Sequence, residues 1–487
     1  MKKTLIALPL CLIFFANAFA FDLVNRAHRE KFSSPEVNQN FRQTQVDTVN
    51  FFNRQTSEVN GLIESFRGTS NLRFDLRSRT FILGNRGKLD LESFTYDGAI
   101  AALAYLVAGQ PRRAANLLRV YRREFNTLKG GRKGLFNAYR TDRAPTRTGI
   151  PAGMDGDRMH LGPNTWMGVA ALQYTAITGR TEFLQFAVDI AIWSSNLTRH
   201  VFPDGSLGAS SMGFGWSPPD WTITFSTENV VDHYALLKML RELYLYANPS
   251  ANVRRIMNDR NFGLAKIEAD MHAIERWMME IVWCAEKGAF NVGVNEFGLD
   301  TTDALDVVSW TIPAMTPQRL VELGVCPIHM MDFANEHFFV ADIIEGERIY
   351  GFDFTNFAGR RRNYVLVWFE GTGFHSVAAQ VMSRWARSIG DEYNAERFRE
   401  YSVFLNDQIF RAAATIGMQH NALPYTSKNP RERQIFTTFA DAWEIPRGRG
   451  GQWVASSSST GWRMLAFGAF DPLGFDRENI DYRIFRR

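Results

Sequence analysis

Residues 96–109 read YDGAIAALAYLVAG, and this stretch decides the fold because almost nothing polar follows its first three residues. Alanine and leucine favour a helix, and a helix without a polar face is buried on nearly all sides. Five later stretches have the same style, a polar start followed by an apolar helix. They are NTWMGVAALQYTAITG (164–179), TENVVDHYALLKML (227–240), DALDVVSWTIPAM (303–315), EGTGFHSVAAQVM (370–382) and STGWRMLAFGAF (459–470).

Amphipathic helices are predicted between these apolar segments, with charge on one side and apolar residues at three- and four-residue spacing on the other. The predicted amphipathic helices span Glu36–Phe66, Arg112–Glu124, Thr181–Asn196, Leu264–Trp283, Asp332–Asp342 and Ala395–Ala414. The two kinds of helix therefore alternate along the chain, six of each.

This alternation predicts an all-α fold, an (α/α)6 toroid of six helical hairpins in which the apolar helices form an inner ring and the amphipathic helices an outer ring. The apolar segments start roughly 60 to 90 residues apart, unlike the fixed 34-residue period of tetratricopeptide arrays. We expect residues 21–487 to form a single domain. The irregular spacing lies in long loops before the inner helices, and such loops are usually functional.

Three of these loops are unusually long: Lys129–Pro163, Phe202–Phe225 and Met418–Ser456. The second contains Trp216 and Trp221, and the third contains Trp443 and Trp453. Tryptophans argue against disorder, and aromatic faces serve as platforms for sugar rings. Aromatic residues make up 13% of the chain, which points in the same direction.

The layout and the inner-helix motifs resemble the six-hairpin glycosidase group, the carbohydrate-active enzymes with (α/α)6 toroids. The resemblance spreads over nearly the whole chain, although each motif is short. The matching motifs are YDGA (96–99), GPNTW (162–166), STENVVD (226–232), ALDVVSW (304–310) and WFEGTG (368–373). The resemblance implies a substrate cleft at the end of the ring where the inner helices begin, and an inverting hydrolysis.

Four inner helices have an acid near their first turn: Asp97, Glu228, Asp306 and Glu370. A glycosidase needs one carboxylic acid to protonate the leaving oxygen and one carboxylate to activate water or attack the sugar. We predict Glu228 as the general acid and Glu370 as the general base, with Asp97 and Asp306 as substitutes in either role. Each acid also has a structural interpretation, because helix starts favour carboxylates.

Residues next to the acids are predicted to bind substrate: Tyr96, Asp232 and His233. Asp232 follows Glu228 by four residues and shares its helix face. A histidine beside a carboxylate also fits a hydrogen-bonded structural residue, so His233 is a secondary candidate. The loop tryptophans Trp216, Trp221, Trp443 and Trp453 complete the predicted sugar contacts, whereas Trp166, Trp310 and Trp462 are expected in the core.

The motifs give no reason to expect a metal or a cofactor. Asp155-Gly156-Asp157 resembles part of a calcium loop but lacks the later Gly and Glu of an EF-hand. HExxH, paired CxxC, P-loop, dinucleotide and GxSxG motifs are absent from the sequence. The formal net charge of +4 comes from interspersed charges, and the run Arg360-Arg361-Arg362 is expected to be a solvated loop and not a nucleic-acid site.

The first twenty residues fit a signal peptide: Lys2 and Lys3 precede an apolar run that ends in Ala18-Phe19-Ala20. We expect cleavage after Ala20, a periplasmic or secreted product, and no membrane insertion. Cys284 and Cys326 remain after cleavage. They either pair in an oxidising compartment or lie buried as small hydrophobes.

The function predicted from these features is hydrolysis of a polysaccharide or oligosaccharide. A polysaccharide lyase on the same toroid is the first alternative, because the basic loop 129–147 with Tyr139, together with His160, supplies residues that suit proton abstraction. A non-catalytic glycan-binding protein of the cell envelope is the second alternative.

Overall fold

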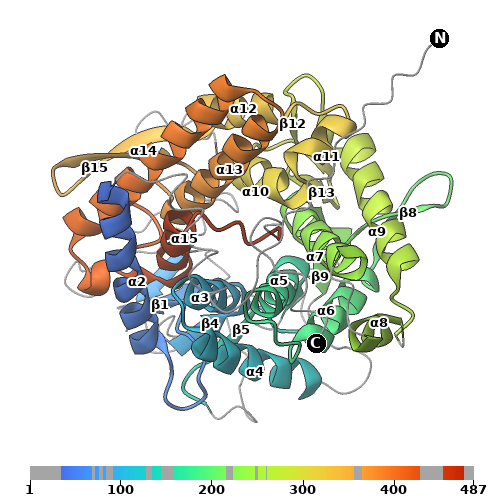
Figure 1. Cartoon of the computed structure of the whole chain (residues 1–487), viewed down its shortest axis with the longest axis horizontal. Helices are drawn as coiled ribbons and strands as arrows, with labels where there is room; N and C mark the ends of the chain where they lie inside the picture. The colour runs from blue at the N-terminus through green and yellow to red at the C-terminus, as the bar shows by residue number, and fades with distance from the viewer. Residues whose placement is uncertain are drawn as a thin grey trace, which may run out of the picture.

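The computed structural model describes residues 35–67, 72–75, 80–83, 91–127, 134–143, 158–214, 223–246, 251–258, 260–355, 365–427 and 453–475. Six helices stand around a common centre and a second set surrounds them (Figure 1). The inner helices are α3 (Thr95–Val107), α5 (Leu161–Thr178), α7 (Thr227–Tyr246), α10 (Leu305–Met315), α13 (Phe369–Ser388) and α15 (Ser457–Phe467). Each packs on the next, and α15 packs on α3, so that the ring is closed.

An outer helix covers the ring at each of its six positions (Figure 1). The outer helices are α2 (Pro35–Gln55), α4 (Pro111–Thr127), α6 (Leu184–Ser195), α9 (Leu264–Trp277), α12 (Pro327–Phe338) and α14 (Glu392–Ile416). The short helices α8 (Ala251–Asn258) and α11 (Pro317–Glu322) join neighbouring elements. The chain therefore folds as the (α/α)6 toroid that the alternation predicts.

Two of the predicted outer helices have wrong boundaries. The helix predicted for Glu36–Phe66 ends at Gln55, and the chain continues through a turn to strand β1 (Phe66–Arg67). The helix predicted for Asp332–Asp342 is shifted: α12 ends at Phe338, and strand β15 (Phe339–Ile344) pairs with β16 (Glu347–Phe352). Burial alternates along β15, so the apolar residues there follow a strand period and not a helical one.

The cysteine prediction is also settled. Cys284 and Cys326 are both free; Cys284 is partly exposed and Cys326 is exposed, so neither the disulfide nor the buried pair is found. No helix among the described residues is sufficiently long and apolar to cross a bilayer. The predicted signal peptide, the Asp155–Asp157 motif and the arginine run at 360–362 lie outside the described residues.

A repeated backbone contact fixes the start of every inner helix. The residue just before each helix pairs antiparallel with the loop that leads to the next hairpin of the ring. The six pairs are Phe94–Ala138, His160–Gly213, Ser226–Gly293, Ala304–Thr355, Trp368–Thr426 and Ser456–Phe66. These pairs belong to β4 (Glu92–Phe94), β5 (Ala138–Arg140), β6 (Met159–His160), β9 (Gly213–Phe214), β10 (Phe225–Ser226), β13 (Gly293–Asn295) and β17 (Ala455–Ser456), to β1, and to two isolated bridges.

The first residue of each inner helix then donates its backbone N–H to a carbonyl oxygen one residue before that pairing partner, at 2.8 to 3.2 Å. These bonds run from Thr95 to Asn137, Leu161 to Met212, Thr227 to Val292, Leu305 to Phe354, Phe369 to Tyr425 and Ser457 to Ser65. Each bond satisfies an N–H group that a helix start leaves without an intrahelical partner. We call the six equivalent pairs and bonds the backbone belt. Because the belt holds all six helices alike, corresponding residues of the helices lie at equivalent places around the ring.

Candidate active site

The second residue of each inner helix lies at the same place relative to the backbone belt. In ring order these residues are Tyr96, Gly162, Glu228, Asp306, Glu370 and Ser458. Three acids therefore stand on three consecutive inner helices, α7, α10 and α13. Three of the four predicted catalytic acids come from hairpins far apart in sequence and meet at equivalent positions.

The sixth residue of each helix, one turn further, forms the layer beneath. In ring order these residues are Ile100, Trp166, Asp232, Trp310, Phe374 and Trp462. Ring centroids of Trp166 lie 5.6 Å from Trp310 and 5.7 Å from Trp462, in edge-to-face geometry. Phe374 lies 5.0 Å from Trp310 and 5.7 Å from Trp462. These aromatic residues are core, as predicted for the three tryptophans, and they form an apolar floor under the acids.

The far end of the ring is covered by the segment that follows α15, which crosses the centre in Figure 1. Gln173 of α5 donates to the carbonyl oxygens of Pro472 and Gly474, both at 2.9 Å. Leu473 and Phe475 are buried in the same place. The acids stand at the opposite end, where the inner helices begin.

Glu370 is surrounded by hydroxyl groups. Ser458 donates its hydroxyl to Glu370 Oε2 at 2.8 Å, and the hydroxyls of Tyr96 and Tyr425 also hydrogen-bond this carboxyl group. Burial raises the pKa of Glu370 to about 7, and the three hydroxyls counteract the rise because they favour the charged form. Glu370 is thus an ionisable group poised near neutral pH, which suits a general base.

Glu228 has a different environment. Burial raises its pKa well above the ordinary value, and the negative charges of Asp306, Asp232 and Glu370 raise it further. Like charges close together disfavour ionisation of a carboxyl group. These effects favour the protonated form of Glu228, the form that a general acid needs before it donates to a leaving oxygen.

Asp306 stands between these two glutamates on the ring. Its Oδ1 accepts the backbone N–H of Val307 at 2.7 Å. Burial nevertheless raises its pKa to about 7. Asp306 is the main source of charge that acts on Glu228, so it influences the protonation of the predicted acid whatever its own role.

Asp97 lies one residue beyond the second helical position and is buried on the side of α15. Burial raises its pKa to about 8, opposed by hydrogen bonds with the hydroxyls of Ser65 and Ser458. Ser458 thus contacts both Asp97 and Glu370. This arrangement places Asp97 behind Ser458, where it supports the hydroxyl that holds Glu370.

Asp232 lies in the aromatic floor, one turn below Glu228, and is 1% exposed. Neither of its carboxyl oxygens has a hydrogen-bond partner of good geometry among the described residues. Burial raises its pKa well above the ordinary value, with Trp166 opposing and Asp306 adding to the rise. A charged carboxyl group is costly to bury, so the neutral form of Asp232 is favoured.

The other predicted substrate contacts fall in three places. Tyr96 is partly exposed at the second helical position and accepts the indole N–H of Trp462 at 2.7 Å. His233 is fully buried and faces Ser195 of α6 at 3.4 Å, and burial lowers its pKa to about 3, which favours the structural interpretation. Trp453 is partly exposed four residues before α15. Trp216, Trp221 and Trp443 lie outside the described residues.

Two residues of the site were missed by sequence reasoning: Ser458 and Tyr425. Ser458 sits in a run of serines that reads as an ordinary helix start. The signal that identifies it is register, because aligning the six helix starts on their first residue puts Ser458 level with Glu370. Tyr425 comes from a loop, and its ring packs 6.1 Å from Trp368 and 6.3 Å from Phe66.

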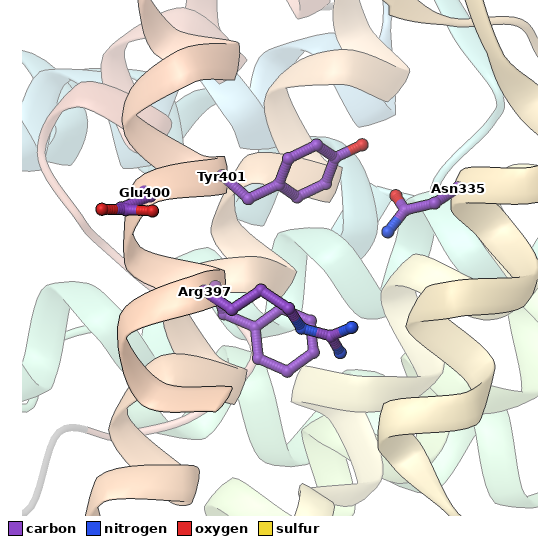
Figure 2. Close-up of a pocket in the computed structure, with 5 residues that line it drawn as sticks. Asn335, Arg397, Glu400 and Tyr401 are labelled. Carbon is purple, nitrogen blue, oxygen red and sulfur yellow. The ribbon is translucent and has the colours of Figure 1, made fainter. Parts of the chain in front are cut away.

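A separate pocket lies outside the ring, between the outer helices α12 and α14 (Figure 2). It has a volume of about 320 Å³, and its walls are Asn335, Arg397, Phe398, Glu400 and Tyr401. None of these five residues belongs to the predicted site. Among the described residues, no group of three or more His, Cys, Asp or Glu side chains is arranged to hold a metal ion.

No protein-family model matches the sequence, and no curated protein matches it at a significant level. Solved structures do match. A glycosidase in complex with glucose has a TM-score of 0.53 at 10% identity, covering 90% of this chain and 99% of its own. A family 76 glycoside hydrolase (mannosidase) from Bacteroides thetaiotaomicron has a TM-score of 0.51 at 10% identity, covering 89% and 97%. Another family 76 enzyme, from a bovine strain of that species, has a TM-score of 0.53 at 9% identity, covering 88% and 76%. The chain therefore has the (α/α)6-toroid fold seen in these glycosidases.

Proposed function

We propose that the protein is a glycoside hydrolase that cleaves a polysaccharide or oligosaccharide, with Glu228 as the general acid and Glu370 as the general base. The observation that carries the proposal is the contrast between two glutamates at equivalent ring positions. Burial and neighbouring carboxyl groups favour the protonated form of Glu228, whereas hydroxyl donors around Glu370 favour its charged form. Pairs of carboxyl groups with separated pKa values are how glycosidases divide the acid and base roles.

The placement of the pair supports an inverting stereochemistry. Glu228 and Glu370 belong to alternate inner helices, with α10 between them. This placement favours the wider carboxylate separation, about 6.5–9.5 Å, that leaves room for a water molecule in inverting enzymes. We propose inversion, and NMR of the first-formed product tests it. A product that keeps the anomeric configuration of the substrate would assign a retaining mechanism instead.

The lyase alternative receives less support from the residues. Tyr139 is buried and packs on Tyr121 of the outer helix α4 at 6.0 Å. Burial raises the pKa of Tyr96, Tyr139 and Tyr425 well above the ordinary value. Burial also lowers the pKa of His160 to about 3. A tyrosinate or a strongly basic histidine for proton abstraction is thus disfavoured near neutral pH.

The test is a digest of a glycan panel with the purified protein, read by product mass and ultraviolet absorbance. Hydrolysis adds water and leaves no unsaturated sugar, whereas elimination produces an absorbing product. Glu228→Gln and Glu370→Gln should each lower kcat by about 100-fold or more, and Glu400→Gln in the outer pocket should not. Full activity in both site variants would refute the assignment, and binding without turnover in the wild type would point to the non-catalytic alternative.

We further propose that residues 1–20 are removed as a signal peptide and that the protein acts in the periplasm or outside the cell. The charged start, the apolar run and the A-x-A site support this proposal. N-terminal sequencing of the protein recovered from a bacterial periplasm should begin at Phe21. A cytoplasmic product that retains Met1 would contradict it.

A further inference from the structure

Phe297 is the most exposed large apolar side chain among the described residues, at 90%. It sits in the turn between β13 and β14 (Gly298–Asp300). The backbone N–H of Phe297 donates to Asn295 Oδ1 at 2.8 Å, and Gly298 follows with a φ of +108°. The aromatic side chain of Phe297 is therefore held by a defined turn and not by a loose loop.

The turn lies at the acid-bearing end of the ring. Gly293, at the start of β13, pairs with Ser226, the residue before α7. Phe297 is four residues further on, which is at most about 14 Å of extended chain. Leu299 on β14 and Ile223, two residues before β10, are each about half exposed. An apolar rim thus stands beside the helix that supplies Glu228.

Trp453 is a second partly exposed aromatic residue, and it lies just before the start of the inner helix α15. It precedes α15 by four residues, and Ala455 between them pairs with Arg67, next to the Ser456–Phe66 pair of the backbone belt. The indole N–H of Trp453 donates to Glu345 Oε1 at 3.3 Å, at the turn of the β15–β16 hairpin. Its ring is partly buried against the core and partly exposed.

The two aromatic residues lie beside different parts of the ring. Starting at α7, the helices α10 and α13 come before α15, so α7 and α15 are three positions apart out of six (Figure 1). Asp306 and Glu370 lie on the helices between them. A chain that joins Phe297 to Trp453 would therefore pass along the part of the ring that bears Asp306 and Glu370.

We propose that a glycan chain lies across the mouth, with one sugar stacked on Phe297 and another on Trp453, so that the substrate extends on both sides of the acids and is cleaved internally. This inference rests on the proposed function and adds the substrate class, a chain of several sugars. The apolar face of a pyranose fits an aromatic ring, and an exposed phenylalanine in a fixed turn loses little entropy on binding. A substrate held only by its end would use one of the two platforms.

The test compares Phe297→Ala with Tyr393→Ala, because Tyr393 is 76% exposed on the outer helix α14. Activity is measured on a polysaccharide and on an aryl glycoside that is too short to reach the rim. Phe297→Ala should lower kcat/KM on the polysaccharide by about two- to tenfold and leave the aryl glycoside unchanged. Trp453→Ala should have the same effect, and Trp453→Phe should recover the kcat/KM on the polysaccharide that Trp453→Ala loses. Tyr393→Ala should match the wild type on both substrates.

Product length and binding complete the test. Early products of the polysaccharide should be a mixture of chain lengths; release of one short product from a chain end would overturn the inference. Retardation in a gel that contains the polysaccharide reports binding without turnover. If the wild type cleaves no glycan and Phe297→Ala still loses retardation, the proposed hydrolysis is refuted, whereas the proposed binding of a glycan across the mouth is supported. If Phe297→Ala and Trp453→Ala show the same retardation and the same activity on the polysaccharide as Tyr393→Ala, the proposed glycan path across the mouth is refuted.

Discussion

Replacing Ser458 by alanine removes one of the hydroxyl donors that hold Glu370 in its charged form. A hydrogen bond to a charged group contributes about 1.5–3 kcal/mol, and one pKa unit corresponds to about 1.4 kcal/mol. Because Tyr96 and Tyr425 still donate, we expect the lower end of that range, a rise of about one unit. The pKa of Glu370 should therefore increase from about 7 to about 8.

The sign of the effect on activity is given by the proposed role of Glu370 as the general base. A general base works when deprotonated, so kcat/KM rises with pH through its pKa. We call this rise of kcat/KM with pH the acidic limb of the profile. In Ser458→Ala the midpoint of the acidic limb should shift to a pH about one unit higher, while the activity on the plateau above it stays measurable. The assay is the pH dependence of kcat/KM on the best glycan of the panel.

The neighbouring residue offers a matched control. Ser459 is also buried in the first turn of α15, and its hydroxyl has no hydrogen-bond partner among the described residues. Ser459→Ala should leave the limb where it is in the wild type. An unmoved limb in Ser458→Ala, or an equal shift in both variants, would show that Glu370 is not the group whose ionisation limits activity.

Three further outcomes are expected. Asp306→Asn should raise the free energy of unfolding at pH 8 by at most about 4 kcal/mol and by almost nothing near pH 4. The folded-state pKa of Asp306, about 7, exceeds the unfolded value, so the stability lost by ionising Asp306 grows as the pH rises between these two values. Denaturant titrations at both pH values measure the gain, and a gain independent of pH would contradict the prediction. Gly293→Ala should prevent stable folding, since a Cβ there would lie 2.2 Å from a backbone oxygen, whereas Gly205→Ala, with nothing within 4 Å, should cost about 1 kcal/mol of strain; comparison of their melting temperatures decides. Asp47→Asn should cost about 3–5 kcal/mol, because it leaves the buried Arg463 without its 3.8 Å ion-pair partner, and a denaturant midpoint equal to that of the wild type would refute this.

The ring was predictable because its signal is spread over the chain. Each inner helix is apolar all round, and six such segments alternating with amphipathic ones leave few other packing solutions. The backbone belt was not predictable, since strands of two residues such as Phe66–Arg67 have no recognisable period. The first residues of β15, Phe339–Asp342, were predicted as the end of a helix because exposed apolar residues such as Phe339 hide the strand period.

The site was partly predictable for the same reason. Glu228, Asp306 and Glu370 could be found as acids in first turns, because helix starts can be recognised locally. Their environments could not be predicted, since the hydroxyls around Glu370 come from residues 96, 425 and 458. Those contacts depend on how the ring closes, and closure is a property of the whole chain.

The backbone belt also has a consequence for how the protein folds. Its last link joins Ser457 to Ser65 and so brings together residues from the two ends of the described chain. Contacts of such large sequence separation form late, because loop-closure entropy must be overcome first. Until that link forms, Tyr96 of α3 is not held beside Glu370 of α13. An incompletely wound chain would therefore be catalytically silent, and the onset of activity during refolding would report the moment at which the ring closes.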